Sequence, residues 1–328
     1  MRYFLVSVSN KVNLELCIRY ALAGFTNSIN GLWTFLEIKE EDYISFLYGA
    51  RVFNLYKVIA KEAFKNAENL PPWPPVTFSM SRKTYYFPFR LRLKPIRKFS
   101  EPMVRPEFAY VAENLLLRGG YRRTHFQADT LTFNYVSQMG QLYNDKVQEL
   151  EITDGERFSP LLCFDKRLAS PPQIFYFHEL VLQSLIKDYL SQITKLRKVL
   201  DYIGKSKYKE DAFEVLGEKA FPEGHVDILI KDKYPSEKSQ KIIVEVKKGV
   251  AKEGDIIQLR NYMNEIKEEC EGGILIANKF SRNIILSARK SGIVLLGYSF
   301  RQIDINRAYS YEELFQKIYL RTLEGDTI

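Results

Sequence analysis

The strongest constraint on this 328-residue chain is a pair of short, β-branched segments that also carry charged side chains. Residues 224–230 read GHVDILI and residues 242–249 read IIVEVKKG, and both runs are typical of β-strands. Because side chains alternate along a strand, Asp227 points away from its apolar neighbours, and Glu245 and Lys247 share one face of the second strand. If the apolar faces of the two strands align, two carboxylates and one ammonium group converge.

Such a cluster predicts a divalent metal site with a general base or a water-positioning group beside it. The alternative is that Glu245 and Lys247 form the solvated side of an amphipathic strand. The following segment favours the catalytic interpretation, because residues 255–268 are predicted to form a helix in which Gln258 and Tyr262 lie four residues apart on one face.

This ordered set of residues resembles the core signature of the PD-(D/E)XK nuclease superfamily, in particular the C-terminal domain of the archaeal NucS/EndoMS endonucleases. The family segments G-x-x-D-[IL]-L, V-[IV]-E-[LV]-K and Q-L-x-x-Y correspond to residues 224–229, 243–247 and 258–262. The resemblance covers roughly the last half of the chain. One departure is that the proline of the superfamily name does not precede Asp227.

The resemblance implies that Asp227, Glu245 and the Val246 carbonyl hold Mg²⁺ or Mn²⁺. It implies that Lys247 orients or deprotonates the attacking water, and that the catalytic Gln258, with Tyr262 in support, braces the site or touches the phosphate backbone. The family also takes a carboxylate from an early helix. Three residues are candidates for that role: Glu179, which opens a predicted helix, and its rivals Glu214 and Glu218.

The composition indicates which class of partner and which cellular compartment to expect. A net charge of +8 and a pI near 9.1 favour a polyanionic partner, and without a strongly basic amphipathic helix we expect nucleic acid and no membrane. No apolar run reaches the length of a membrane span. Three cysteines and three histidines show no metal-ligand spacing, so we expect a reducing, cytoplasmic location. His225 shares a strand face with Asp227 and is the histidine to test.

The N-terminal part, residues 1–153, reads as a small β-rich domain with an early helix. Its beginning and the segments around Trp33 and residues 42–48 resemble the PUA-like group that contains EVE and YTH domains. That group holds a modified base in an aromatic pocket, which implies Trp33 as a pocket wall and Ser9 and Asn10 as contacts to the base edge. Trp73 in a proline-rich loop is a further contact candidate, with a loop anchor as its alternative.

A row of cations in the same part suggests a second contact with nucleic acid. Arg90, Arg92 and Lys94 alternate with apolar residues in a predicted strand, which would present their charges from one face.

The fold class expected from these observations is a two-domain α+β protein. Residues 1–153 would form a PUA-like β-barrel with flanking helices, 154–173 a linker, and 174–328 a restriction-endonuclease-like α/β mixed sheet. We expect a modification-dependent, Mg²⁺-dependent DNA endonuclease that acts as a homodimer, with RNA also open as a ligand of the N-terminal domain. The alternatives are a NucS-like mismatch or structure-specific repair endonuclease and a non-catalytic nucleic-acid reader.

Overall fold

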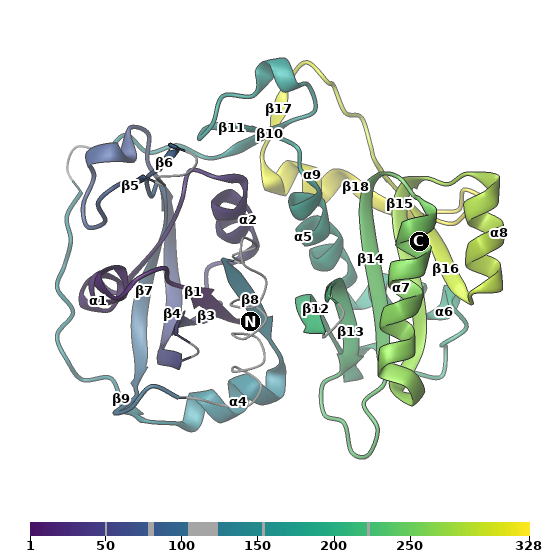
Figure 1. Ribbon diagram of the computed structural model, residues 1–328, viewed down its shortest axis with the longest axis horizontal. Helices are drawn as coiled ribbons and strands as arrows, with labels where there is room; N and C mark the ends of the chain where they lie inside the picture. Colours follow the sequence, from purple (N-terminus) through teal and green to yellow (C-terminus); the bar gives the residue numbers. More distant parts are fainter. Residues whose placement is uncertain (50, 78–81, 104–123, 153–154, 222–223) are drawn as a thin grey trace. The chain divides into compact units, whose positions relative to one another are not determined.

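The computed structural model describes residues 1–49, 51–77, 82–103, 124–152, 155–221 and 224–328, and in residues 218–221 and 224 it describes the backbone alone. The chain is a mixed α+β protein that divides into two compact units (Figure 1). Unit 1 comprises Met1–Tyr176 and Asn306–Ser310, and unit 2 comprises Phe177–Ile305 and Tyr311–Ile328. Among the described helices, none is long and apolar enough to cross a membrane.

Unit 1 is built on a seven-stranded sheet in the order β2-β7-β4-β3-β1-β8, with β9 paired to β7. The strands are β1 (Tyr3–Ser7), β2 (Leu22–Phe25), β3 (Tyr43–Tyr48), β4 (Arg51–Ala63), β7 (Phe89–Lys98), β8 (His125–Ala128) and β9 (Gln141–Leu142). The β3–β4 pair is antiparallel, as expected from the hairpin pattern, and β1 runs parallel to β3. In the described part of the chain β2 and β8 end the order without pairing to each other, so the PUA-like barrel stays a prediction.

Three described helices accompany this sheet, and each begins at a side-chain cap. They are α1 (Lys11–Tyr20), α2 (Ile29–Glu37) and α4 (Thr130–Gln138). Asn10, Ser28 and Asp129 each accept a hydrogen bond from a backbone N–H in the first turn, which satisfies one of the donors that a helix start leaves open.

The segment expected to be a linker folds as part of unit 1. It contains β10 (Leu161–Cys163), which pairs with β11 (Ile174–Tyr176) and with β17 (Ala308–Tyr309), a strand that returns from far along the chain. Leu162 and Cys163 are fully buried, so this segment is packed rather than solvated. The remaining short elements of unit 1 are β5 (Val76–Thr77), β6 (Thr84–Tyr85) and the 3₁₀ turns Ala67–Asn69 and Lys166–Leu168.

Unit 2 is a six-stranded mixed sheet in the order β12-β13-β14-β15-β16-β18. The strands are β12 (Phe213–Phe221), β13 (Gly224–Asp232), β14 (Lys241–Val250), β15 (Cys270–Lys279), β16 (Ile293–Phe300) and β18 (Ile318–Arg321). The β13–β14 pair is antiparallel, whereas β14, β15 and β16 run parallel. The carboxyl ends of these three strands therefore meet at one edge of the sheet.

The helices of unit 2 are α5 (Glu179–Leu190), α6 (Ile193–Tyr202), α7 (Glu253–Ile266), α8 (Arg282–Lys290) and α9 (Tyr311–Lys317). Two short 3₁₀ turns, Glu210–Ala212 and Lys267–Glu269, complete the unit. Figure 1 shows α7 and α8 alongside β14, β15 and β16, with α5 on the other side of the sheet.

Both faces of this sheet are buried, which explains why its strands read as nearly continuous apolar runs. Ile243 and Leu275 lie in a core that also contains Ile256 and Leu259 of α7. Their neighbour Val244, which points to the other face, is also fully buried. A charged side chain in the middle of β14 is therefore enclosed whichever way it points.

Candidate active site

The β13–β14 ladder opens where the first acidic residue lies. The paired register runs from Lys231↔Lys241 to Ile228↔Val244 and ends there. At the next step the Val246 N–H donates to the Asp227 carboxylate Oδ2 at 2.8 Å, so a side chain satisfies the backbone group at the end of the ladder. This bond places the Asp227 carboxylate, which is 9% exposed, beside the residues that follow Val244.

Glu245 is the centre of the cluster and is 0% exposed, which excludes the solvated-face interpretation. Its Oε1 accepts hydrogen bonds from Lys247 Nζ at 2.7 Å and from Gln258 Nε2 at 3.0 Å. Its Oε2 is buried and has no hydrogen-bond partner among the described residues. Burial and the nearby charge of Asp227 raise the pKa of Glu245 well above its ordinary value, although Lys247 opposes the shift.

Lys247 is held between acidic groups. Burial by itself would lower the pKa of this amine, but the charges of Glu245 and Asp227 and the hydrogen bond to Glu245 outweigh burial and raise it. Its Nζ also lies 3.9 Å from Asp255 Oδ1 and 4.0 Å from Glu179 Oε1. Its position between these carboxylates suits the orientation of a water and the neutralisation of charge, and the role of Lys247 in orienting or deprotonating the water stays a prediction.

Among the three candidates from an early helix, the structure brings Glu179 to the cluster. Glu179 is the first residue of α5, and its Oε2 accepts the Lys248 N–H at 2.8 Å. Glu214 instead faces Lys231 across the β12–β13 pair, with Lys231 Nζ 3.6 Å from its Oε1. The side chain of Glu218 lies outside the described part of the structure.

Helix α7 braces the cluster through a chain of hydrogen bonds. Gln258 Nε2 donates to Glu245 and lies 3.3 Å from the Tyr262 hydroxyl, which in turn donates to the His225 carbonyl at 3.1 Å. The predicted four-residue spacing of Gln258 and Tyr262 thus places both on the face that meets the sheet. His225 takes part in this chain of hydrogen bonds through its backbone carbonyl.

Sequence reasoning missed Asp255, whose carboxylate is the third acidic group near Lys247. Its Oδ2 accepts the backbone N–H of Lys252, which makes Asp255 part of the cap that starts α7. The sequence carried only a weak signal for this residue, because acidic side chains are common in the first turn of any helix.

The donor set fits a hard divalent cation. No group of three or more His, Cys, Asp or Glu side chains that could hold a metal forms in the described residues. Mg²⁺, however, is typically bound by one or two carboxylates and keeps several waters. The buried Oε2 of Glu245, which lacks a hydrogen bond, and the like charge of Asp227 beside it are the features that a dication would satisfy.

The two tryptophans of unit 1 are core residues and do not line an open base pocket. Trp33 is 1% exposed and packs on the His125 ring at a centroid distance of 4.3 Å. Trp73 is 4% exposed, and its ring fills the space at Gly24, where an added Cβ would lie 2.5 Å from the indole. The predicted base contacts by Trp33 and Trp73 therefore do not fit this structure, because neither ring face is open to a ligand.

The arginines of the predicted cation row differ in how far they are buried. Arg90 is 1% exposed and donates to the carbonyls of Phe87, Pro71 and Leu70, so it holds a loop and does not face a ligand. Burial lowers its pKa to about 10, although nearby Glu62 opposes the shift. Arg92 is partly exposed and is paired with Glu62 at 2.7 Å.

The predicted base-edge contacts are exposed at the start of α1. Asn10 caps the helix by accepting the Asn13 N–H at 2.8 Å, and Ser9 precedes it. Asn10 therefore has a structural role as a helix cap. Because the residue is exposed, this role is compatible with a contact to a ligand.

A cavity of about 540 Å³ lies between α1 and the β3–β4 hairpin. It combines two aromatic rings, aliphatic side chains and charged groups at its rim. Its lining residues are Lys11, Leu14, Glu15, Ile18, Tyr48, Gly49, Arg51, Phe53 and Pro102. This size falls within the range of small-molecule sites.

Neither a protein-family model nor a curated protein matches this chain. Among solved structures, it is similar to a repair endonuclease from Pyrococcus abyssi, with 20% identity over 32% of this chain and 44% of that chain and a TM-score of 0.23. The EndoMS–dsDNA2 complex matches with 21% identity over 30% and 41%, at a TM-score of 0.23. The MspJI restriction endonuclease, solved in complex with a 27-mer oligonucleotide, matches with 11% identity over 89% and 64%, at 0.18.

The matched region thus spans less than half the length of the two repair proteins. TM-scores of this size do not establish a shared fold.

Proposed function

We propose that the chain is a Mg²⁺-dependent DNA endonuclease whose active site is the cluster of Asp227, Glu245 and Lys247. The observation that carries the proposal is the Glu245 carboxylate, buried at 0% exposure, with Oε1 held by two donors and Oε2 without a hydrogen-bond partner among the described residues. A buried, incompletely satisfied carboxylate beside a second one is costly for folding alone, and phosphodiester hydrolysis supplies a reason to keep it.

Asp227, Glu245 and the Val246 carbonyl would hold the metal, with Glu179 near enough to Lys247 to complete the acidic side of the site. Bound Mg²⁺ would polarise the phosphoryl oxygens and lower the pKa of a bound water.

The protein groups around the metal have separate tasks. Lys247 keeps its positive charge next to the reacting phosphate and offsets the negative charge that develops there. Gln258 fixes the rotamer of Glu245 by holding Oε1, which would leave Oε2 available to bind the metal. Tyr262 fixes Gln258 through its hydroxyl.

The test is cleavage of labelled duplex DNA with Mg²⁺ by the wild type, by Glu245→Gln and by Lys247→Met. We expect both variants to lose at least about 100-fold in rate, because each removes a group that stabilises the transition state. Glu268→Gln is the matched control, since Glu268 is an exposed acid of unit 2 that pairs with the surface residue Lys238. Equal rates for Glu245→Gln and the control would contradict the proposal.

We further propose that unit 1 selects a modified base for this nuclease. The cavity beside α1 supports this role, because Tyr48 and Phe53 provide rings on which an extruded base would stack and Lys11 and Arg51 provide cations for its phosphate. Adenine-methylated, cytosine-methylated and unmodified duplexes of one sequence test the idea. Cleavage confined to a methylated duplex and lost in Phe53→Ala is expected, and equal cleavage of all three duplexes would contradict it.

The alternatives give different outcomes in the same assay. A mismatch or structure-specific repair enzyme would cut mismatched duplex whatever its methylation. A non-catalytic reader would bind without cutting, and an RNA-directed unit 1 would prefer RNA of the same sequence. Because cutting both strands needs two sites, we propose a homodimer, which light scattering on the protein with and without DNA would detect.

A further inference from the structure

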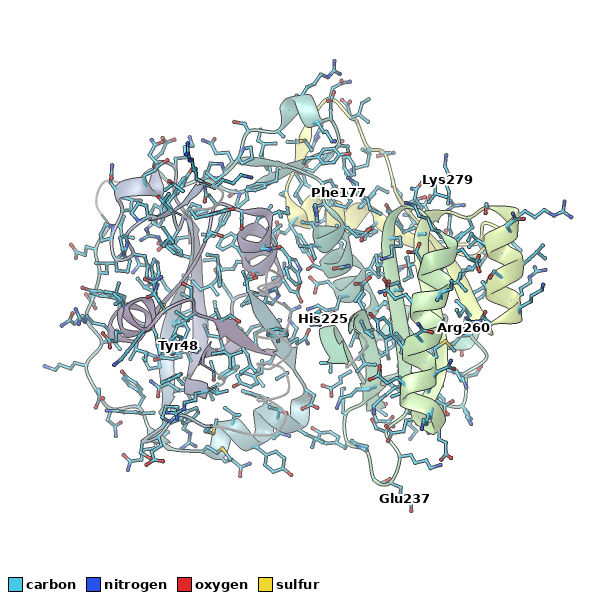
Figure 2. All side chains as sticks on the ribbon, in the orientation of Figure 1. Tyr48, Phe177, His225, Glu237, Arg260 and Lys279 are labelled. Atoms are coloured by element: carbon cyan, nitrogen blue, oxygen red, sulfur yellow. The ribbon has the colours of Figure 1, made fainter. Side chains whose placement is uncertain are left out.

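A row of unpaired cations follows the candidate active site along the same sheet edge. Lys279 ends β15, Arg282 begins α8, and Lys252 precedes α7, and all three side chains are exposed. Within the described residues, none of the three side chains forms an ion pair with an acidic group. Figure 2 labels Lys279 at this end of β15.

The sheet register sets their position relative to the active site. Lys247 lies beside Ala277 in the parallel β14–β15 pair, and Lys279 is two residues further along, or about 7 Å at the rise of a strand. The Ala251 N–H donates to the Lys279 carbonyl at 3.1 Å, which holds the start of Lys252 next to the end of β15. The three cations therefore continue from Lys247 across the carboxyl ends of two neighbouring strands.

Helix electrostatics does not favour the charges of Lys252 and Arg282 at these positions. Lys252 occupies the position before α7, where Ser, Thr, Asp or Asn would satisfy the helix start, and Arg282 is the first residue of α8. Cations at helix starts oppose the helix dipole, whereas Arg289 and Lys290 in the last turn of α8 agree with it. An anion bound at this edge would offset the unfavourable interaction between these cations and the helix dipoles.

We propose that Lys252, Lys279 and Arg282 bind the phosphates on one side of the scissile phosphate, so that the nucleic-acid backbone runs from Lys247 across the ends of β14 and β15 toward the start of α8. Only the identity of the ligand, a nucleic acid, rests on the proposed function. Glu253 also lies at this edge, but its carboxylate accepts a hydrogen bond from the Ser287 hydroxyl at 2.6 Å, which turns it toward α8.

The test compares two double variants of the full chain in binding a labelled 25-base-pair duplex without Mg²⁺, at a series of salt concentrations. Lys279→Gln/Arg282→Gln removes two cations at the proposed surface. Arg289→Gln/Lys290→Gln removes two exposed cations from the other end of the same helix and changes the net charge equally. We expect the first double variant to bind about tenfold more weakly and to lose about 1.8 from the slope of log K against log salt, and the second to stay within about twofold of the wild type.

Thermal stability provides a second readout. Because Arg282 opposes the dipole of α8 and Arg289 agrees with it, Arg282→Gln should raise the melting temperature slightly and Arg289→Gln should lower it. A purely structural role for Arg282 would instead lower both stability and binding.

The outcomes separate this inference from the proposed function. Weaker binding by the first double variant, with no cleavage by the wild type, would support the surface and remove the nuclease. Cleavage by the wild type with equal binding by both double variants would remove the surface and leave the nuclease. A wild type that binds no nucleic acid would overturn both.

Discussion

At the scale of single residues, one cluster of buried charges is unfavourable for the stability of the fold. Glu245 is buried with a carboxylate neighbour, and Lys247 is enclosed with it. Buried charges repay their desolvation only when their geometry is good, and replacing them with apolar groups often stabilises a protein. A site of this kind is therefore better explained by its chemistry than by its contribution to the fold.

Gln258 is a positioning residue, and removing its amide tests that role. We expect Gln258→Leu to lower the cleavage rate by roughly 10- to 100-fold, because Glu245 Oε1 loses the donor that fixes its rotamer. The amount of Mg²⁺ needed for half-maximal rate should rise as well, which a merely structural effect would not produce. Asn261→Ala, an exposed position on the same helix, serves as the control.

At the scale of elements, alternation along a strand does not by itself decide which charged side chains are exposed. Burial by neighbouring segments decides it as well. In β7 the pattern predicted three cations on one face, but Arg90 is buried and bonded to loop carbonyls whereas Lys94 is exposed. The Arg90 guanidinium lies 5.4 Å from the centre of the Trp73 ring, so Arg90 joins the strand to the proline-rich loop. Arg90 therefore has a structural role near the start of β7.

Replacement of Arg90 should therefore affect stability and leave nucleic-acid binding unchanged. We expect Arg90→Met to lower the free energy of unfolding by roughly 3 kcal/mol, because three loop carbonyls lose their donors. Lys94→Gln on the same strand should stay within about 0.5 kcal/mol of the wild type. Urea denaturation measures both changes. A loss of DNA affinity in Arg90→Met at a temperature where it remains folded would restore the nucleic-acid role.

At the scale of the whole molecule, the chain forms two units that are not simple halves. Unit 1 includes Asn306–Ser310, which return from the C-terminal part to place β17 beside β10. A cut after residue 173, at the end of the expected linker, would therefore separate β10 from both of its partner strands, β11 and β17. For this reason the experiments above use the full chain.

Metal binding should be visible in the stability of the whole chain even without a substrate. We expect Mg²⁺ to raise the melting temperature of the wild type, with a gain of about 1.4 kcal/mol when its concentration is ten times Kd, because the ion binds the folded site and not the unfolded chain. Glu245→Gln should lose this gain. NaCl of the same ionic strength is the control, and an equal rise in both proteins would contradict a metal site at Glu245.

The elements around the motif were largely predictable from the sequence. Expected strands over residues 224–230 and 242–249 appear as β13 and β14, and the expected helix appears as α7. The periodicity of apolar residues is a local property and survives in any compact fold, so it predicts such elements well. Strands β12 and β18 carry weaker patterns and were not foreseen.

The sequence by itself determined which chemistry is present: Asp227, Glu245 and Lys247 on neighbouring strands and Gln258 on the next helix. The tertiary structure decided what each group can do, because burial and neighbouring charge are properties of packing between distant segments. Packing leaves Glu245 Oε2 buried without a hydrogen bond from the described residues, places Lys247 between carboxylates that raise its pKa, and encloses Trp33 in a core. Alternation along a strand tells which side chains share a face, but only the other layers of the fold determine whether that face meets water, a ligand or another side chain.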